Sequence, residues 1–444
     1  MTAALRVGID GYNIALLHGT GVATYARALA QVLAAGGCSV EGVFGLAAPE
    51  RERLREILFL EEFGRGQIGQ SKWRTYVERA KERFTAPVLR EIVRSGLVER
   101  GAFVERLPAF ERIYSASGLF ERAERYFKGT RRLLEIRLPD PPQIMHWTYP
   151  LPIRLAGAHN VYTLHDLVPL KLPYTTLDRK RTYLGVLDAI AANADHICTV
   201  SEHSRSDILA MLKVDPARVT NTWQTAPRPP TSAQDDNARA VRGVFGLEPR
   251  GYFLYYGALE PKKNIGRIIE AYLSLETRTP LVIVGARAWS ADEELRLLRV
   301  DRKSAGEFGR SLDQRIVELG YLPRELLMKL VGGARAVVFP SLYEGFGLPV
   351  LEAMQAGTPV VTSTTSALPE VAGDAALCVD PYSIDAIADA MRRLDGDADL
   401  AAELTRRGSV QAAQFSATLY RDRLSAMYEG IMATPIRNGR KSIS

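Results

Sequence analysis

Two glutamates, Glu344 and Glu352, are the residues of this chain whose types and spacing most clearly indicate chemistry. The apolar run 336–339 that precedes them is typical of a buried parallel strand. Pro349 fits the first turn of a following helix, and Gly357 fits its C-terminal end. One carboxylate is therefore expected in a loop between strand and helix, and the other about two turns into the helix.

The spacing of the two carboxylates favours one elongated ligand. At a rise of 1.5 Å per residue, they are expected roughly 10 Å apart along the helix axis. That separation suits a ligand with two polar ends better than a metal ion or an acid–base pair. Gly345 and Gly347 lie between the two carboxylates, so the backbone can approach the ligand closely.

The elements that must position these residues form two blocks in which short strands alternate with helices. The strands expected in the first block are 5–9, 39–44, 143–146, 160–163, 196–200 and 219–221. The strands expected in the second block are 252–256, 280–284, 316–319, 336–339, 359–362 and 376–379. This alternation implies βαβ units and parallel sheets. We therefore expect an α/β fold of two Rossmann-like, doubly wound domains that face a cleft, with ligand at the carboxyl ends of the strands.

A Pro-rich, polar stretch at 225–236 is the best candidate for a link between the two blocks. We expect four parts in chain order: an N-terminal domain over 1–224 with a helical insertion at about 48–142, a linker over 225–240, a second domain over 241–415, and a C-terminal helix and tail over 416–444. The C-terminal helix is expected to cross back to the N-terminal domain.

The expected insertion is rich in Arg and Glu and shows no clear strands. Its segment 115–137 mixes apolar and basic side chains, namely Leu119, Phe120, Tyr126, Phe127, Leu133 and Leu134 with Arg122, Arg125, Lys128, Arg131 and Arg132. The favoured interpretation is an amphipathic helical pair that covers the sheet. The alternative is a basic, aromatic surface that rests on an anionic membrane.

Composition limits the classes of protein to which this chain can belong. The 444 residues, 46% apolar and 24% charged, are typical of a soluble globular protein with two domains. The net charge of +6 is compatible with phosphate-bearing ligands or an anionic membrane, and too small to predict nucleic-acid binding. The three cysteines lie far apart in apolar runs, which favours free thiols in a reducing cytoplasm. No stretch reaches the length of a membrane span, and no apolar leader precedes the first expected strand.

Polar residues also follow expected strands of the first block. His165 and Asp166 come directly after the apolar run 161–164, where His165 could donate to a phosphate or a sugar hydroxyl. The alternative is a structural histidine held by backbone. The loop 18–25 places glycines before a helix, where they could cradle phosphate or simply form a turn. Ser201 is explained as the N-cap of the next helix, and the alternative is that the segment 201–204 also lines the acceptor side.

Two lysines, Lys262 and Lys263, lie in the loop 257–264 after the first strand of the second block. Ammonium groups at such a junction can bind a pyrophosphate, whereas solvated surface lysines are the plainer explanation. The segment 320–323 closes another strand and could present backbone to a nucleobase. The sequence contains no spaced Cys/His cluster for zinc, no Gly-x-Ser-x-Gly elbow and no Walker loop, so we expect no metal.

These motifs, in this order, resemble those of the retaining glycosyltransferases of family 4, which have the GT-B fold. The style of the motifs is similar to that of bacterial polysaccharide and lipopolysaccharide enzymes. The strongest match is 339–352, in which Glu344 and Glu352 form the E-x7-E signature. The other matching segments are 19–25, 163–169, 260–264, 357–361 and 369–373. The resemblance covers nearly the whole chain.

The resemblance implies that the second domain binds a sugar nucleotide and the first binds the acceptor. Catalytic roles would fall to Glu344 on a hydroxyl of the donor sugar, Lys263 on the leaving phosphate, and His165 near the reacting carbon. The remaining donor-binding residues would be Gly21, Lys262, Tyr321, Leu322, Gly345, Phe346, Gly347, Leu348 and Glu352. In this scheme Glu352 holds the ribose, and the helix N-terminus faces the diphosphate.

The implied activity is transfer of a hexose, with mannose from GDP-mannose favoured, to a glycan or lipid-linked glycan acceptor with retention of anomeric configuration. No cofactor or metal is expected, because the nucleotide sugar is a substrate. We expect a cytoplasmic enzyme without a nucleic-acid partner, and peripheral contact with the anionic inner face of the plasma membrane stays open. The alternatives are another GT-B enzyme, such as a nucleotide-sugar epimerase, a phosphorylase-like degrader or a UDP-sugar-dependent transferase, and a non-catalytic GT-B scaffold.

One position departs from the family pattern. Many members carry Arg directly after the glycine of the lysine loop, where this chain has Ala258. One phosphate-binding cation is therefore missing there. Either Lys262 or an arginine elsewhere would have to replace it.

Overall fold

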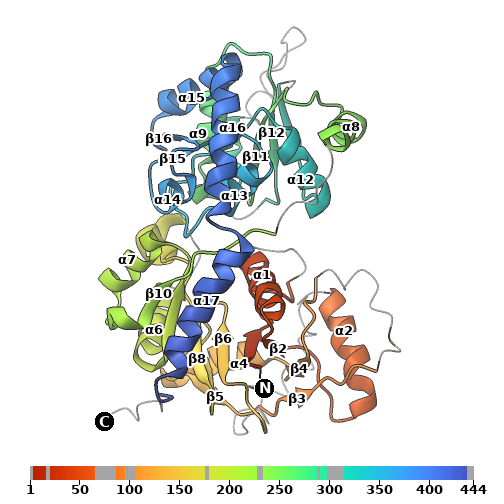
Figure 1. Cartoon of the computed structure of the whole chain (residues 1–444), viewed down its shortest axis with the longest axis vertical. Helices are drawn as coiled ribbons and strands as arrows, with labels where there is room; N and C mark the ends of the chain where they lie inside the picture. Colours follow the sequence, from red (N-terminus) through yellow and green to blue (C-terminus); the bar gives the residue numbers. More distant parts are fainter. Residues whose placement is uncertain are drawn as a thin grey trace.

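The structure is a computed structural model, and it describes residues 4–16, 21–65, 87–95, 98, 106–175, 180–227, 234–287, 291–297 and 315–437. Figure 1 shows two lobes, each built around a β-sheet with helices packed on it. The lower lobe holds the strands of the first block, and the upper lobe holds those of the second.

The N-terminal sheet has the strand order β10-β9-β8-β6-β1-β2-β4-β3. Its strands are β1 (Arg6–Asp10), β2 (Ser39–Phe44), β3 (Arg90–Glu91), β4 (Arg112–Ser115), β6 (Ile144–Trp147), β8 (His159–Thr163), β9 (His196–Thr199) and β10 (Val219–Asn221). All neighbouring strands pair in parallel except β3 with β4. A separate parallel pair joins β5 (Leu134–Ile136) to β7 (Ile153–Leu155).

The second sheet has the order β13-β12-β11-β14-β15-β16, and all of its pairs are parallel. Its strands are β11 (Phe253–Tyr256), β12 (Leu281–Val284), β13 (Ile316–Leu319), β14 (Ala336–Phe339), β15 (Val360–Ser363) and β16 (Leu377–Val379). Numbered within the sheet, this is the order 3-2-1-4-5-6 of dinucleotide-binding folds. The order reverses between β11 and β14, so a ligand crevice is expected there.

Helices cover both sheets. They are α1 (Gly21–Ala35), α2 (Arg55–Arg65), α4 (Leu119–Thr130), α5 (Val168–Lys171), α6 (Lys180–Asn193), α7 (Glu202–Met211), α8 (Gln234–Phe245), α9 (Ile265–Leu273), α10 (Ala291–Glu294), α12 (Arg324–Gly333), α13 (Leu348–Gln355), α14 (Leu368–Ala372), α15 (Ile384–Gly396), α16 (Ala398–Ala413) and α17 (Ala417–Met432). The strands β11, β12 and β14 are fully buried, which explains why they are continuous apolar runs.

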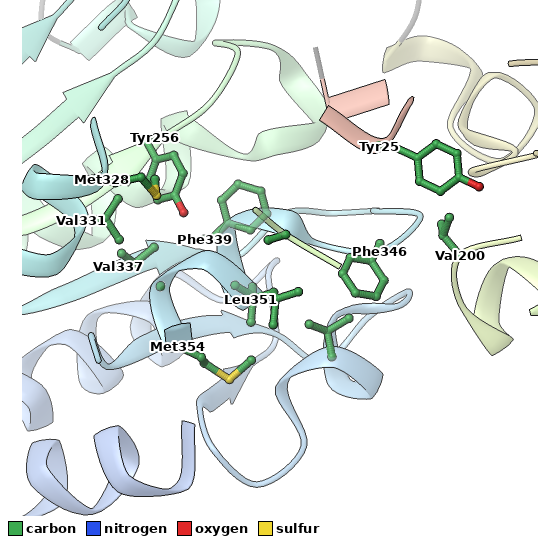
Figure 2. Close-up of a cluster of buried hydrophobic side chains, with 14 of the residues drawn as sticks. Tyr25, Val200, Tyr256, Met328, Val331, Val337, Phe339, Phe346, Leu351 and Met354 are labelled. Carbon is green, nitrogen blue, oxygen red and sulfur yellow. The ribbon is translucent and has the colours of Figure 1, made fainter. Parts of the chain in front are cut away.

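One hydrophobic core runs through both lobes. It includes Tyr25 and Val200 of the first domain together with Phe346 and Leu351 of the second. Figure 2 shows Phe346 between Leu351 on one side and Tyr25 and Val200 on the other. Because apolar surface is buried at this junction, the two domains meet here in a packed contact instead of being joined only by the chain.

The C-terminal helix α17 lies on the first domain, whereas α16 lies on the second (Figure 1). Helix α17 packs against α1, and the Tyr428 hydroxyl is 2.6 Å from Nδ1 of His146 on β6. Beyond the helix, the backbone N–H of Arg437 donates to Asp195 over 2.6 Å. These contacts hold the C-terminal end of the described chain against the N-terminal sheet.

Two sequence predictions of organisation differ from the structure. The expected linker 225–240 is shorter, since α8 begins at Gln234 and packs against α12 of the second domain. The expected insertion 48–142 is not wholly helical, because β4 belongs to the main sheet and the expected helical pair at 115–137 is the single helix α4 followed by β5. The apolar residues Phe120 and Phe127 of α4 are buried, so this helix does cover the core.

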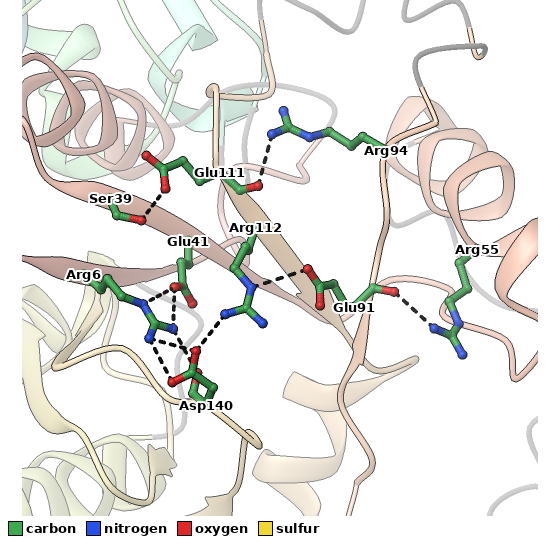
Figure 3. Close-up of polar contacts among 9 residues, drawn as sticks. All are labelled: Arg6, Ser39, Glu41, Arg55, Glu91, Arg94, Glu111, Arg112 and Asp140. Carbon is green, nitrogen blue, oxygen red and sulfur yellow. Dashed lines mark hydrogen bonds and ion pairs between the residues drawn. The ribbon is translucent and has the colours of Figure 1, made fainter. Parts of the chain in front are cut away.

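The strand β4 escaped prediction because it is short and begins with a charged residue, although its other three residues are buried. Arg112 at its start forms ion pairs with Glu91 at 3.4 Å and Asp140 at 3.0 Å. Asp140 also pairs with Arg6, which in turn binds the buried Glu41 at 2.8 Å (Figure 3). This network neutralises charge at the amino ends of β1, β2 and β4, so charged residues fit into strands of a packed sheet.

Candidate active site

The candidate site lies at the switch point of the second sheet, where β11 pairs with β14. The loop after β14 carries Glu344, and the short 3-10 turn after β11 (Pro261–Lys263) carries both lysines. The Leu342 N–H donates to the Lys262 carbonyl over 2.8 Å, which fastens the two loops together. Strand order alone therefore brings residues about 80 positions apart in sequence into one site.

Glu344 and Lys263 form a direct ion pair, with 2.6 Å between Oε1 and Nζ. Both side chains are nearly buried, and the Lys263 ammonium also lies 5.0 Å from the centroid of the Phe339 ring. Burial would raise the pKa of Glu344, but the charges of Lys263 and Lys262 outweigh it and hold that pKa below its usual value. Glu344 is therefore a carboxylate, able to accept hydrogen bonds from sugar hydroxyls and unable to donate a proton near neutral pH.

Lys262 forms a looser pair with Glu260, with 3.6 Å between charged atoms. Burial lowers the pKa of Lys262, but Glu344, Asp166 and Glu260 together raise it above its ordinary value. The side chain is thus a permanent cation. Because Asp166 belongs to the first domain, Lys262 faces across the junction of the two domains.

Glu352 is the fifth residue of α13, just over one turn into the helix and not the expected two. Its carboxylate is held at both oxygens, by the Arg324 guanidinium at 2.8 Å and by the Tyr256 hydroxyl at 3.1 Å. The sequence did not predict these two partners. Arg324 opens α12 directly after the predicted segment 320–323, and that position after a strand was the signal available to find it.

The two glycines between the glutamates, Gly345 and Gly347, lie where a Cβ atom would come too close to neighbouring atoms. Gly347 has φ 107°, and a Cβ there would lie 2.6 Å from the Leu368 side chain. A Cβ on Gly345 would lie 2.3 Å from the His165 carbonyl oxygen. Gly347 also begins α13 without a side-chain cap, so N–H groups at this helix N-terminus lack a side-chain acceptor. The Phe346 ring is buried against Phe415, so only its backbone is offered to a ligand.

The glycine loop touches the first domain directly. The Gly345 carbonyl accepts a hydrogen bond from Ser201 Oγ over 2.7 Å and lies 3.2 Å from Ser204 Oγ. Ser201 is the N-cap of α7, as the sequence predicts, and accepts from the Ser204 N–H at 3.0 Å. Nearby, Gly21 at the start of α1 lies against Leu348, since a Cβ on that glycine would be 3.8 Å from the leucine side chain.

A second contact between the domains joins α14 to α7. The Glu370 carboxylate accepts from the backbone N–H of Glu202 at 2.9 Å and of His203 at 3.3 Å. It also accepts from the Trp223 indole N–H at 2.5 Å. A carboxylate of the second domain thus caps a helix of the first, where the helix dipole favours negative charge.

His165 is held as a neutral imidazole. Its Nε2 lies 2.9 Å from the Thr148 carbonyl, so Nε2 carries the proton and Nδ1 is left as an acceptor. Tyr25 lies edge-on to its ring at a centroid distance of 4.7 Å. Burial lowers the pKa of His165 in spite of opposing effects from Thr148 and Asp166. His165 can therefore accept a hydrogen bond from a sugar hydroxyl, and it brings no charge to a phosphate.

The Thr148 peptide that orients His165 is itself held by a buried carboxyl. Its N–H donates to Asp10 at the end of β1, which also accepts from the Tyr12 N–H at 3.2 Å. Burial raises the pKa of Asp10 to about 6. A path of hydrogen bonds therefore runs from Asp10 through Thr148 to His165.

The structure brings most of the predicted residues together and leaves two at a distance along the sheet. Lys262, Lys263, Glu344, Gly345 and His165 meet at the junction of the domains. Tyr321 and Leu322 follow β13, which lies two strands from β11, and the Tyr321 side chain is 57% exposed. His18, Gly19 and Thr20 of the predicted phosphate cradle lie outside the described residues.

A cavity of about 890 Å³ lies elsewhere, between the two domains and beside α1. It is lined by parts of α1, α12 and α13 and by the connecting residues 225–227. None of the residues predicted to bind the donor lines it.

Within the described ranges, no cluster of His, Cys, Asp or Glu could hold a metal ion. Over the same part of the chain, every helix is too short or too polar to cross a bilayer.

Comparison with known families and proteins agrees with this geometry. The family model described as "Glycosyl transferases group 1" matches residues 240–410, and the model "Glycosyl transferase 4-like domain" matches residues 20–221. The O-antigen chain mannosyltransferase B of Escherichia coli is 33% identical over 348 residues, which cover 74% of this chain and 88% of that protein.

Solved structures show the same fold over nearly the full length. Sucrose-phosphate synthase from Thermosynechococcus elongatus aligns with a TM-score of 0.66 at 18% identity, covering 97% of this chain and 99% of the other. Anabaena HepE in complex with UDP-glucose aligns with a TM-score of 0.65 at 12% identity, covering 96% and 100%. These likenesses confirm the predicted GT-B architecture of two Rossmann-like domains.

Proposed function

This chain belongs to the family 4 glycosyltransferases, and on that basis we propose that it transfers mannose from GDP-mannose to a glycan or lipid-linked glycan acceptor with retention of configuration. The observation that carries the proposal is the Glu344–Lys263 ion pair at the switch point of the second sheet. The similarity of the chain to an O-antigen mannosyltransferase supports mannose as the sugar that is transferred.

The donor is proposed to lie along the carboxyl edge of the second sheet. Glu344 accepts from a hydroxyl of the sugar, and Lys262 and Lys263 supply positive charge to the diphosphate. The N-terminus of α13 adds N–H groups that lack a side-chain cap. Glu352 meets the ribose hydroxyls, with Arg324 and Tyr256 fixing its carboxylate in place. Tyr321 and Leu322 then border the base.

The proposed reaction needs no enzymic nucleophile. The bond between the anomeric carbon and the phosphate oxygen breaks, and negative charge develops on the departing diphosphate. Lys263 stabilises that charge from a preorganised position, an effect that typically contributes about 10²- to 10³-fold in rate for one such group. The acceptor hydroxyl attacks on the same face, and its proton passes to the departing phosphate oxygen. Neutral His165 orients the sugar by accepting from one of its hydroxyls.

The cellular setting is part of the same proposal. A lipid-linked acceptor would place the enzyme in the cytoplasm at the inner face of the plasma membrane. The exposed basic residues Arg125, Lys128 and Arg132 of α4 and its C-terminal end are the surface that would meet anionic lipid. Binding of the protein to vesicles that contain phosphatidylglycerol, compared with neutral vesicles, tests this part separately.

Thermal unfolding with a panel of nucleotide sugars tests the donor. A ligand at about 100 times its Kd stabilises by about 2.7 kcal/mol, so GDP-mannose is expected to raise the melting temperature by about 3 °C. A larger shift with a UDP-sugar would overturn the assignment of the donor.

Proton NMR of the product of GDP-mannose and a mannose-terminated oligosaccharide should show an α-linkage, and a β-linkage would overturn retention. Turnover of the donor to another sugar nucleotide without acceptor would identify an epimerase instead.

A further inference from the structure

The N-terminal sheet has a switch point of its own, between β1 and β6. From β1 the order runs outward through β2 and β4 on one side, and through β6, β8, β9 and β10 on the other. In such sheets a ligand crevice forms beyond the carboxyl ends of the two strands at the switch. Tyr12 follows β1 and Tyr149 follows β6, so each strand at this switch point is followed by a tyrosine.

The two tyrosine rings are stacked on each other. Their centroids are 5.9 Å apart, and their planes differ by 25°. Phe120 of α4, which is buried, meets Tyr12 edge-on at 5.2 Å and fixes its orientation. Both tyrosines pack against the core of the first domain and remain partly exposed. The rings are therefore supported from within the domain while part of their surface faces solvent.

The tyrosine pair is connected to the proposed reacting centre. The Tyr12 N–H and the Thr148 N–H both donate to the Asp10 carboxyl, and the Thr148 carbonyl orients His165. Tyr149 is the next residue after Thr148. A ring stacked on the tyrosine pair would thus lie beside the group that contacts the donor sugar.

Two carboxylates of α4 act on the tyrosine pair. Burial raises the pKa of the Tyr12 hydroxyl, and the charges of the exposed Glu124 and Glu121 and of Asp10 raise it further. Carboxylates accept hydrogen bonds from sugar hydroxyls and repel phosphate. Glu124 is partly balanced by Lys128 at 3.4 Å, an exposed pair that water screens.

We propose that Tyr12 and Tyr149 form a platform on which the terminal sugar of the acceptor stacks, so that the acceptor enters this site as an uncharged saccharide. The proposal rests on the proposed function, since it places the acceptor opposite the donor. A pyranose ring presents a face of C–H groups, and the negative face of an aromatic ring attracts it. Any phosphate or lipid carried by the acceptor then lies beyond the tyrosine pair, away from Glu121 and Glu124.

Direct binding to the whole protein tests the platform without requiring catalysis. Methyl α-mannobioside, methyl α-maltoside and glycerol 3-phosphate are titrated in the presence of saturating GDP, with saturation-transfer NMR as the readout. Tyr12→Ala and Tyr149→Ala are expected to raise the Kd of the bound disaccharide about tenfold. Tyr12→Phe and Tyr149→Phe are expected to stay within twofold, because they keep the ring. Tyr126→Ala, which removes an exposed tyrosine of α4 outside the pair, is the matched control.

Two outcomes would overturn the platform. Unchanged disaccharide binding in both alanine variants excludes stacking on the pair. Binding of glycerol 3-phosphate by the wild type without binding of either disaccharide shows that the acceptor is recognised by its phosphate. The Kd of GDP is expected to stay unchanged in the alanine variants, which shows that these variants are folded. Because the donor assay uses GDP-mannose alone, failure of the proposed donor is seen separately from failure of the platform.

Discussion

The two switch points of this molecule use opposite chemistry. At the switch of the second sheet, charged side chains come in ion pairs, Lys263 with Glu344 and Arg324 with Glu352. At the switch of the first sheet, a neutral His165 and a stacked pair of tyrosines take their place. The same topological rule positions both sites, so the rule decides where a ligand binds and the side chains decide which ligand.

In the proposed reaction, this difference fits the two substrates of a sugar transfer, with the donor side at the second sheet and the acceptor side at the first. The donor carries a diphosphate whose charge increases as it leaves, so permanent cations at its site stabilise the transition state. The acceptor brings a hydroxyl that is neutral before the reaction, and a cation near it would only attract the wrong ligand. Burial in the first domain keeps His165 uncharged, whereas in the second domain burial is outweighed by opposite charges around Glu344.

The largest effect is expected from breaking the donor side at its centre. Glu344→Ala removes the acceptor for a sugar hydroxyl and leaves Lys263 nearly buried without its partner, so the rate of transfer should fall about 10³-fold, or about 4 kcal/mol. Initial rates with GDP-mannose measure this. Glu325→Ala is the matched control, because it removes an exposed glutamate of the same domain that pairs with Lys329 at 2.9 Å. Near-normal transfer by Glu344→Ala would contradict the assignment.

The next effect separates phosphate recognition from base recognition. Lys263→Ala should raise the Kd of GDP about 10- to 100-fold and leave the Kd of guanosine within twofold, because hydrogen bonds to charged groups contribute about 1.5–3 kcal/mol. Isothermal titration calorimetry measures both constants. Lys329→Ala serves as the control. Equal losses for GDP and guanosine would place Lys263 away from the diphosphate.

Much of this comparison could be predicted from the sequence on the donor side. The strand 336–339 matches the prediction residue for residue, because a strand buried on both faces is a short apolar run. The strand 316–319 matches as well, although it lies at the edge of the sheet and is partly exposed. Glu344 and Lys263 stood out because each follows such a run, and parallel strands bring their carboxyl ends to one edge.

The acceptor side could not be predicted in the same way. Tyr12 and Tyr149 meet only because β1 pairs with β6, and no local pattern encodes which strands become neighbours. The contact of Arg324 with Glu352 and the place of β4 in the main sheet could not be predicted either, because both depend on which elements become neighbours. Periodicity predicts elements, whereas these contacts depend on the order in which the elements assemble.

The folding stability of the protein should depend on pH through Asp10, which lies on the proposed acceptor side. The pKa of Asp10 rises from 3.8 to about 6 on folding, so between about pH 4 and 6 the folded state keeps a proton that the unfolded chain has lost. Stability due to this group is therefore present at low pH and lost as pH rises through 6, by at most about 3 kcal/mol.

Asp10→Asn removes that titration. The difference in unfolding midpoint between wild type and variant, measured in urea from pH 4 to 7, should change in favour of the variant as pH rises. Contributions from other carboxyl groups cancel in this difference. Parallel profiles would show that Asp10 has the same pKa in both states, and that its burial does not perturb that pKa.

The smallest effect is expected where the two sides meet. Glu370→Gln keeps the shape of the side chain but removes the charge that caps α7 across the junction, a change of about 1 kcal/mol in the contact. We expect transfer to fall severalfold while the Kd of GDP stays the same, because the nucleotide part of the donor is proposed to be held by the second domain. Small-angle scattering should show a larger radius of gyration, and Trp223 fluorescence should change with loss of its hydrogen bond. Glu403→Gln on the surface of α16 is the control. If Glu370→Gln weakens GDP binding as much as it slows transfer, then the domains do not divide the two substrates between them, and the contrast between the two switch points has another origin.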